Sequence, residues 1–311
     1  MRDAKAARRA FKLRTKLYAL IRTFFAERGV LEVETPVLSE GGNTEPNIES
    51  FSTTFAGARD RWLRTSPEHA LKRLVASGIG DCYEIGRVFR NGEAGRRHNP
   101  EFTMLEWYRV GFDHRRLMRE TAALVLASLA SKGWSADVVE TCYRNLFAGL
   151  GIDPFEAPID ALRAPLAEFG IDPAGLSRDD WLDLLITHRI QPSFPKDRIT
   201  VVYDFPASQC ALAKVRDGIA ERFELFLGTY ELANGYHELT DAAEQRARFE
   251  NDNARRRARG QREVSIDERF LGALPDMPAC AGVALGIERL LMYLADTDDI
   301  ADVIAFPFAD A

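Results

Sequence analysis

The chain has 311 residues, of which 46% are hydrophobic and 28% are charged, and its net charge is −6. This is the composition of an ordinary globular protein. No apolar run is long enough to cross a membrane, and the N-terminus lacks the apolar core of a secretory signal. The negative net charge argues against a wide basic surface for nucleic acid. The four cysteines are scattered without a CxxC pair, which argues against a disulfide framework or a zinc site and favours a reducing cytoplasm. The length predicts that residues 1–311 form one large domain, or one domain with a sizeable insertion, with a substantial core.

The N-terminal region predicts a helix followed by a strand. Residues 11–28 carry apolar side chains at a helical spacing, and Gly29 is expected to end that helix. Residues 30–38 then read as a strand that is interrupted by Pro36.

Residues 61–77 combine a short strand with a capped helix. Ser66 is the expected N-cap and Pro67 the first helical residue. Glu68 then lies in the first turn, where a carboxylate is electrostatically favoured.

The segment from Cys82 to Tyr108 predicts two strands joined by a charged loop. Because side chains alternate along a strand, Phe102, Met104, Glu106 and Tyr108 share one face, which has the mixed character of a polar cleft. The loop between the strands contains three arginines and His98 (the arginines are Arg90, Arg96 and Arg97). Such a loop is suited to binding phosphate oxygens, because the guanidinium group is a planar fork of donors.

Residues 113 to about 198 predict a helical insertion, and His114 and His188 within it are interpreted as surface or core residues. Further along, Glu224 and Glu231 are seven positions apart. They would lie two turns apart on a helix, or face each other in a hairpin centred on Leu227 and Gly228, and the residue types favour strands. Paired carboxylates that face a phosphate site suggest Mg²⁺.

The last part of the chain predicts a strand face, a basic helix and a glycine-rich strand that leads into a helix. Asn234, Tyr236 and Glu238 alternate and therefore line one face. The helix near 242–263 ends in a basic run, interpreted as a solvated face or alternatively as a docking patch for an acidic partner. Residues 282–294 open the final helix, with an arginine at position 289.

Three of these segments, in this order, resemble the motifs of class II aminoacyl-tRNA synthetases, and lysyl-tRNA synthetase most closely. The helix and strand up to residue 38 resemble motif 1, residues 89–91 with 98–103 resemble motif 2, and residues 282–289 resemble motif 3. The resemblance implies an α+β fold, in which an antiparallel β-sheet is flanked by helices. It also implies a homodimer formed through the motif 1 region.

The resemblance further implies that an amino acid is activated by ATP with Mg²⁺. Arg90 would bridge the amino-acid carboxylate and the α-phosphate, Phe102 and Arg289 would sandwich the adenine, and His98 with Arg289 would reach the γ-phosphate. Glu224 and Glu231 would bind Mg²⁺. The full set implied for ATP is Arg90, Asn91, Gly92, Glu93, His98, Asn99, Phe102, Glu231, Leu232, Gly286 and Arg289, with Arg90 and Arg289 catalytic.

The implied amino-acid site is acidic and suits lysine or an isomer of lysine. Glu68 of the Ser66–Pro67–Glu68 turn would receive one amino group. The distal ammonium would be received by Glu106, Tyr108 and Glu238, with Asn234 nearby. Two positions depart from lysyl-tRNA synthetase: Ala284 stands where that family has glycine, and Gly92 stands where it has glutamate, with Glu93 one position later. The extra methyl group of Ala284 would disfavour α-lysine.

Together these features resemble a branch of truncated lysyl-tRNA synthetase paralogues that transfer (R)-β-lysine to a lysine ε-amine of elongation factor P. Motif 1 begins close to the first residue, so we expect no anticodon-binding barrel and no tRNA acceptor. The alternatives are a lysyl-tRNA synthetase-like ligase that uses α-lysine or another acceptor, and an inactive regulatory paralogue. Arg90, Arg289, Glu224 and Glu231 are all present, which favours an active enzyme.

Overall fold

The computed structural model describes residues 4–57 and 59–311. The chain divides into two compact units, Met1–Phe112 with Leu239–Ala311, and Asp113–Glu238. The interpretation of the chain as a single domain stays a prediction. No helix in the described part of the chain is long and apolar enough to span a membrane.

The first unit contains five helices and seven strands among its described residues. The helices are α1 (Ala4–Ala26), α2 (Glu68–Ala76), α7 (Ala242–Ala258), α8 (Glu268–Ala273) and α9 (Ile287–Ala295), with 3₁₀ turns at Leu274–Asp276, Ile300–Asp302 and Phe308–Asp310. The strands are β1 (Leu31–Glu32), β2 (Leu38–Ser39), β3 (Ser52–Phe55), β4 (Arg59–Leu63), β5 (Cys82–Phe89), β6 (Glu101–Val110) and β12 (Cys280–Gly286).

The strands of this unit form two sheets, with the order β1-β5-β6-β12 in one and β2-β4-β3 in the other. All pairs are antiparallel except β1 with β5. The single strand predicted at 30–38 is therefore wrong in one respect. The segment forms two short strands, β1 and β2, which belong to different sheets. The interruption falls where Pro36 removes a backbone donor.

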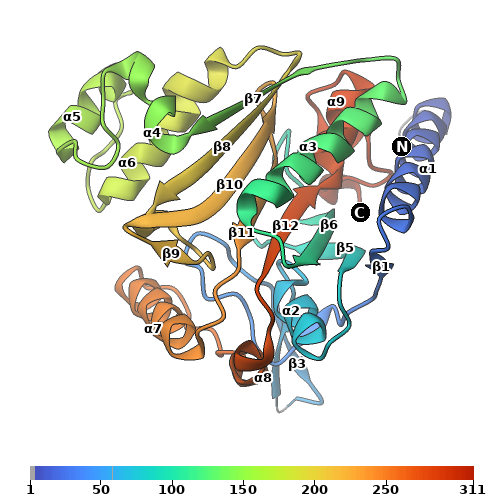
Figure 1. Ribbon diagram of the computed structural model, residues 1–311, viewed down its shortest axis with the longest axis horizontal. Helices are drawn as coiled ribbons and strands as arrows, with labels where there is room; N and C mark the ends of the chain where they lie inside the picture. The colour runs from blue at the N-terminus through green and yellow to red at the C-terminus, as the bar shows by residue number, and fades with distance from the viewer. Residues whose placement is uncertain (1–3, 58) are drawn as a thin grey trace. The chain divides into compact units, whose positions relative to one another are not determined.

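Helix α1 is fixed to the larger sheet by aromatic packing. It begins seven residues earlier than predicted, at Ala4, and buries four apolar residues (Leu17, Ile21, Phe24 and Phe25). The Phe25 ring stacks on Tyr83 of β5 with 4.3 Å between centroids, and meets Trp107 of β6 edge-on at 5.3 Å. In Figure 1, α1 lies beside α9, with which it is in contact.

The second unit contains α3 (His114–Ala130), α4 (Tyr143–Leu146), α5 (Ile159–Arg163), α6 (Arg178–Leu185) and a π-helical turn (Ile186–Ile190), with 3₁₀ turns at Ala148–Leu150, Ala164–Phe169, Gln191–Ser193 and Ala207–Gln209. Its strands are β7 (Asp137–Cys142), β8 (Arg198–Pro206), β9 (Val215–Arg216), β10 (Ile219–Leu227) and β11 (Tyr230–His237). They follow the order β11-β10-β8-β7, with β9 paired to β10.

The predicted helical insertion at 113–198 is helical for the most part, but it also contains β7, which pairs in parallel with β8. The short helices that follow β7 gather beside β8 in Figure 1. Their apolar residues, among them Trp181 and Leu185, form one core with Val202, Phe205 and Phe226 of the strands. Helix α3 packs separately against β8, β10 and β11. Both units thus confirm the predicted α+β fold, with mostly antiparallel strands flanked by helices.

Candidate active site

The loop between β5 and β6 is a tight, closed connection. The strands pair from Cys82 opposite Tyr108 to Phe89 opposite Glu101, as the sequence predicted. Gly95 and His98 form a bridge across the loop, and the backbone of Asn91 bonds to Glu49. Gly92 has a φ of +83°, a left-handed conformation that glycine adopts without strain. A glutamate at position 92 would be strained in this backbone.

Arg90 lies over an aromatic ring next to an acidic residue. Its guanidinium carbon is 5.2 Å from the centroid of Phe102, and its Nη1 is 3.7 Å from Oε1 of Glu93. Its buried Nε has no hydrogen-bond partner among the described residues. Three of the predicted nucleotide residues are therefore adjacent, and Arg90 retains a donor for a ligand.

His98 and Arg289 are also brought together, with 3.1 Å between the His98 Nε2 and an Arg289 Nη. Gly286 ends β12 just before this arginine. Asn99 is used differently: its amide donates to the carbonyl of Glu101 and accepts from the backbone of Phe308. Its contacts are those of a residue that holds the loop.

On β6, Glu106 is the centre of a buried hydrogen-bonded cluster. Ser66 Oγ donates to Glu106 Oε2, and the Tyr108 hydroxyl donates to Oε1, both at 2.8 Å. The predicted shared face is thus confirmed, although Glu106 and Tyr108 are each only 2% exposed. The pKa of Glu106 is raised to about 8, first by burial and second by the charge of Glu68, while the hydrogen bonds and Lys72 lower it.

Glu68 has a partner that the sequence analysis missed. Lys72, which is 1% exposed, places its Nζ 2.5 Å from Glu68 Oε1. The i,i+4 spacing of the two residues on a helix was the available signal. Helix α2 begins at Glu68, one residue later than predicted, yet Ser66 Oγ still accepts from the Glu68 backbone N–H.

Ala284 lies directly opposite Glu106 in the β6–β12 pair. Opposed residues in an antiparallel pair project to the same face, so the methyl group of Ala284 and the Cβ of Glu106 are neighbours on that face. On the other side of β6, Glu84 opposes Glu106. Glu84 is bound by Arg64 at 2.6 Å, and its charge is therefore balanced.

In the second unit, Glu224 and Glu231 lie on a β-hairpin. Strands β10 and β11 are joined through Gly228, whose φ is +54°, so the helical alternative is wrong. The expectation that the two carboxylates oppose each other directly is also wrong. A bulge between Leu225 and Phe226 shifts the register, and Glu224 opposes Asn234 while Glu231 opposes Phe226.

Arg222 binds Glu224 and its surroundings, and it too was missed by the sequence analysis. Its guanidinium group donates to Glu224, to Asn234 Oδ1 at 3.2 Å and to the Gln209 carbonyl at 2.8 Å. The pKa of Glu224 is raised to about 7, first by loss of water; Arg222 lowers it and the charge of Glu231 raises it. The charge of Glu231 therefore acts on the Glu224 carboxyl group.

The remaining predicted residues of this unit lie along β11. Asn234 is on the face of Arg222, and the Tyr236 ring lies 6.0 Å below that guanidinium, which agrees with the predicted alternation. Glu238 is buried just after the strand, at 2% exposure, and Leu232 is buried at 2%. The substrate and nucleotide roles of these residues stay predictions.

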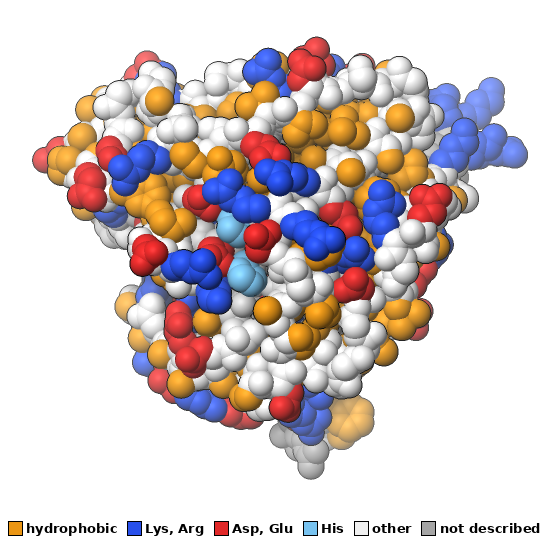
Figure 2. Space-filling view, in the orientation of Figure 1, with side chains coloured by type: hydrophobic (Ala, Val, Ile, Leu, Met, Phe, Trp, Pro, Cys, Tyr) orange, Lys and Arg blue, Asp and Glu red, His pale blue; other side chains and the backbone are white. Residues whose placement is uncertain are grey.

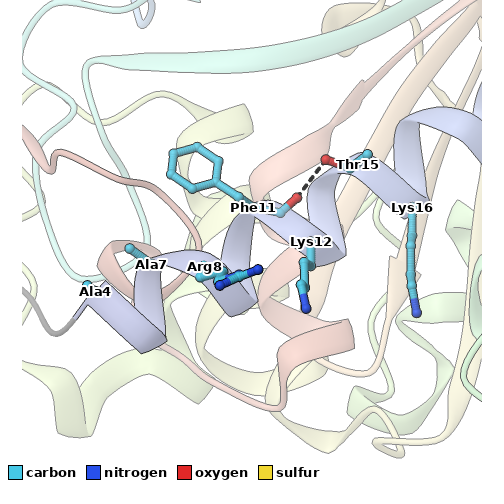
Figure 3. Close-up of a pocket in the computed structure, with 7 residues that line it drawn as sticks. All are labelled: Ala4, Ala7, Arg8, Phe11, Lys12, Thr15 and Lys16. Atoms are coloured by element: carbon cyan, nitrogen blue, oxygen red, sulfur yellow. Dashed lines mark hydrogen bonds between the residues drawn. The ribbon is translucent and has the colours of Figure 1, made fainter.

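Two surface features lie apart from these residues. A hollow of about 730 Å³ runs along α1 between Ala4 and Lys16 (Figure 3), and it contains no predicted site residue. The basic end of α7 is largely neutralised within the chain: Arg256 is buried against Glu49, Arg257 pairs with Glu263, and Arg255 with Asp252. Acidic and basic side chains are likewise interspersed on the face shown in Figure 2.

Known proteins are similar to this chain over nearly its whole length. The family model described as "tRNA synthetases class II (D, K and N)" matches residues 1–310. Curated relatives called elongation factor P–(R)-β-lysine ligase include that of Proteus mirabilis (46% identical; 94% of this chain, 93% of the relative). They also include those of Histophilus somni (45%; 94% and 93%) and Vibrio cholerae (45%; 96% and 95%). The chain therefore belongs to the class II tRNA synthetase family of the D, K and N type.

Proposed function

We propose that the protein is an ATP-dependent, AMP-forming ligase that activates (R)-β-lysine and transfers it to a lysine ε-amine of elongation factor P. The observation that carries this proposal is the match of 94% or more of the chain to relatives of that printed name. The acidic cluster around Glu106 supports it, because a cationic substrate would offset the burial and the repulsion from Glu68 that raise the pKa of this carboxyl group.

The reaction has two steps. A carboxylate oxygen of the amino acid attacks the α-phosphorus of ATP, an oxygen–phosphorus bond forms, and pyrophosphate leaves. The acceptor ε-amine then attacks the carbonyl carbon of the adenylate, an amide bond forms, the amine loses a proton, and AMP leaves. Neither step requires a covalent bond to the protein, so the expected contribution of the protein is positioning and charge stabilisation.

Arg90 is proposed to stabilise the charge that develops at the α-phosphate. Its unsatisfied Nε and its position over Phe102 support this role. The close contact of His98 with Arg289 supports a shared role at the terminal phosphate. Glu93 lies within 3.7 Å of Arg90, and we propose that it supplies the carboxylate that the family has one position earlier.

Glu224 and Glu231 are proposed to bind the Mg²⁺ that accompanies ATP. Two oxygen-donor carboxylates whose charges act on each other fit this ion, which takes one or two carboxylates together with substrate phosphates. When bound, Mg²⁺ neutralises phosphate charge. Arg222 holds the Glu224 carboxylate in place and limits the repulsion between the pair.

Ala284 is proposed to favour β-lysine over α-lysine, since its methyl group is a neighbour of Glu106. The test is amino-acid-dependent ATP–pyrophosphate exchange with (R)-β-lysine or α-lysine, followed by transfer to purified elongation factor P measured by mass. Wild type should prefer β-lysine, and Ala284→Gly should reduce that preference about tenfold, the lower end of the effect of one methylene group in a pocket. Preference of wild type for α-lysine would support a lysyl-tRNA synthetase-like ligase. Absence of exchange with both would support an inactive paralogue.

We further propose that the protein acts in the cytoplasm as a homodimer formed through α1 and the strands after it. Large apolar side chains are exposed in this region: Phe11 (53%), Leu31 (50%) and Leu38 (40%). Light scattering should give the mass of a dimer for wild type and of a monomer for Leu31→Asp. Phe306→Asp, which changes a 71% exposed residue outside this region, is the matched control and should leave the dimer intact.

A further inference from the structure

The second unit carries a group of metal-ligating side chains that the proposed reaction does not use. Residues alternate along β10 and β11, so Glu221 and His237 project from the face opposite to that of Arg222, Glu224 and Asn234. Helix α3 packs against these strands and contributes His114. One ligand atom from each of His114, Glu221 and His237 lies within 4.8 Å of the other two.

The environment of His114 is that of a metal ligand with a supporting carboxylate. The residue is 6% exposed, and its Nε2 is 3.0 Å from Asp204 Oδ1. When Nε2 carries the proton and donates it to this carboxylate, Nδ1 keeps its lone pair. Nδ1 is buried and has no hydrogen-bond partner among the described residues. Histidines that bind metals commonly donate their other ring N–H to a carboxylate in this way.

The other two ligands are already in contact. His237 Nδ1 and Glu221 Oε2 share a short hydrogen bond, and both side chains are mostly buried, at 14% and 13% exposure. A metal ion would replace the proton between them, as metals do when they bind imidazole and carboxylate groups.

The nearby charges allow a cation here. Asp204 is paired with Arg115 at 2.6 Å, and the other oxygen of Glu221 is 3.6 Å from Arg216, whose side chain is 63% exposed to water. Two arginines therefore face two carboxylates. Nitrogen-rich donor sets select zinc-type ions, whereas Mg²⁺ prefers oxygen.

We propose that His114, Glu221 and His237 form a binding site for a divalent transition metal of the zinc type, with Asp204 as the residue that positions His114. The bound ion would join α3 to the β10–β11 hairpin, which carries Glu224 on its other face. The sequence predicted no zinc site because it contains no CxxC pair. Here the ligands are histidines that are distant in sequence.

The test uses the full-length, tag-free protein stripped with chelator. Co²⁺ should bind with a stoichiometry of one and give visible d–d absorption bands, and Zn²⁺ should displace it and raise the melting temperature. Excess Mg²⁺ should leave the bands unchanged, which separates this site from Glu224 and Glu231. ATP and amino acid are absent, so the outcome does not depend on the proposed ligase reaction.

Variants assign the site. His114→Gln and His237→Gln should each weaken Co²⁺ binding at least 100-fold, and Asp204→Asn should weaken it about 10- to 100-fold, the usual effect of losing a supporting carboxylate. His188→Gln, which changes a histidine packed on Phe169 at 4.8 Å, should bind Co²⁺ as wild type does. Circular dichroism identifies variants that fail to fold. The proposal is overturned if wild type binds no Co²⁺, or if folded His114→Gln and His237→Gln bind it as tightly as wild type.

Discussion

The two units each contain a pair of carboxylates beside an internal cation, and the cations differ. In the first unit Glu106 is held by two neutral hydroxyl groups, while Lys72 binds its neighbour Glu68. In the second unit Glu224 is bound directly by Arg222. Burial first, and then the charge of the other carboxylate, raises the pKa of Glu106 to about 8 and that of Glu224 to about 7.

The comparison shows how surroundings assign different tasks to the same side chain. Neutral donors orient Glu106 but supply no positive charge, so burial keeps a proton on this carboxyl group in the free protein. An incoming ammonium group would displace that proton and form an ion pair with the carboxylate. In the second pair, the guanidinium group of Arg222 fixes the Glu224 carboxylate and offsets part of its charge. This arrangement suits a divalent cation that is bound together with substrate phosphates. We propose the first pair for amino-acid recognition and the second for magnesium.

Removing the Glu106 carboxylate tests the assignment of the first pair to amino-acid recognition most directly. Glu106→Gln should lower kcat/KM for (R)-β-lysine in ATP–pyrophosphate exchange by about 200- to 5000-fold, because a buried charge pair that loses one partner costs about 3–5 kcal/mol. Glu101→Gln, at the exposed end of the same strand, should behave as wild type. A Glu106→Gln enzyme within tenfold of wild type would show that this carboxylate does not bind substrate.

The corresponding change in the second pair is Glu224→Gln. It should lower the rate about 100-fold and raise the Mg²⁺ concentration needed for half-maximal exchange, since one of two metal carboxylates is lost. Titration of Mg²⁺ at saturating ATP measures both quantities. Glu140→Gln, at an exposed carboxylate on β7, is the control. An unchanged Mg²⁺ requirement in the Glu224 variant would contradict the metal assignment.

Arg222→Lys tests whether the several hydrogen-bond donors of the guanidinium group, as well as its charge, stabilise the fold. Lysine keeps the positive charge but cannot reach Glu224, Asn234 and Gln209 together. We expect a loss of about 2 kcal/mol in the free energy of unfolding, the sum of two lost hydrogen bonds in a partly buried site. Urea unfolding measures it. Arg119→Lys, at an exposed ion pair, should change stability by less than about 0.5 kcal/mol, and equal losses at both positions would refute the prediction.

We also expect the free energy of unfolding to depend weakly on pH through Glu106. The pKa of Glu106 is raised to about 8 in the folded protein, so the native state holds a proton that the unfolded chain releases near pH 4.5. The contribution of this proton to the free energy of unfolding is therefore fully present below about pH 4.5, and it is lost as the pH rises through about 8. We expect wild type to lose about 1 kcal/mol more than Glu106→Gln between pH 5 and pH 8 in denaturant unfolding, because the coupling to Glu68 shares the titration. Parallel curves for the two proteins would contradict it.

Local sequence pattern determined much of the site. Strand alternation predicted that Glu106 and Tyr108 share a face, and their hydrogen bond confirms it. Gly228 and the residue types around it predicted the hairpin that carries Glu224 and Glu231. These features depend on side-chain periodicity and backbone preference, which are properties of a few consecutive residues.

Tertiary structure decided which groups neutralise or support these side chains. The bulge after Leu225 changed the register of the two carboxylates, Arg222 joined strand and turn residues, and β7 formed because β8 offered a parallel partner. The cluster of His114, Glu221 and His237 exists only because α3 packs on the hairpin. Hydrogen-bond partners and burial come from segments far apart in the chain, and the packing of those segments, which sets each pKa, has no local signature in the sequence.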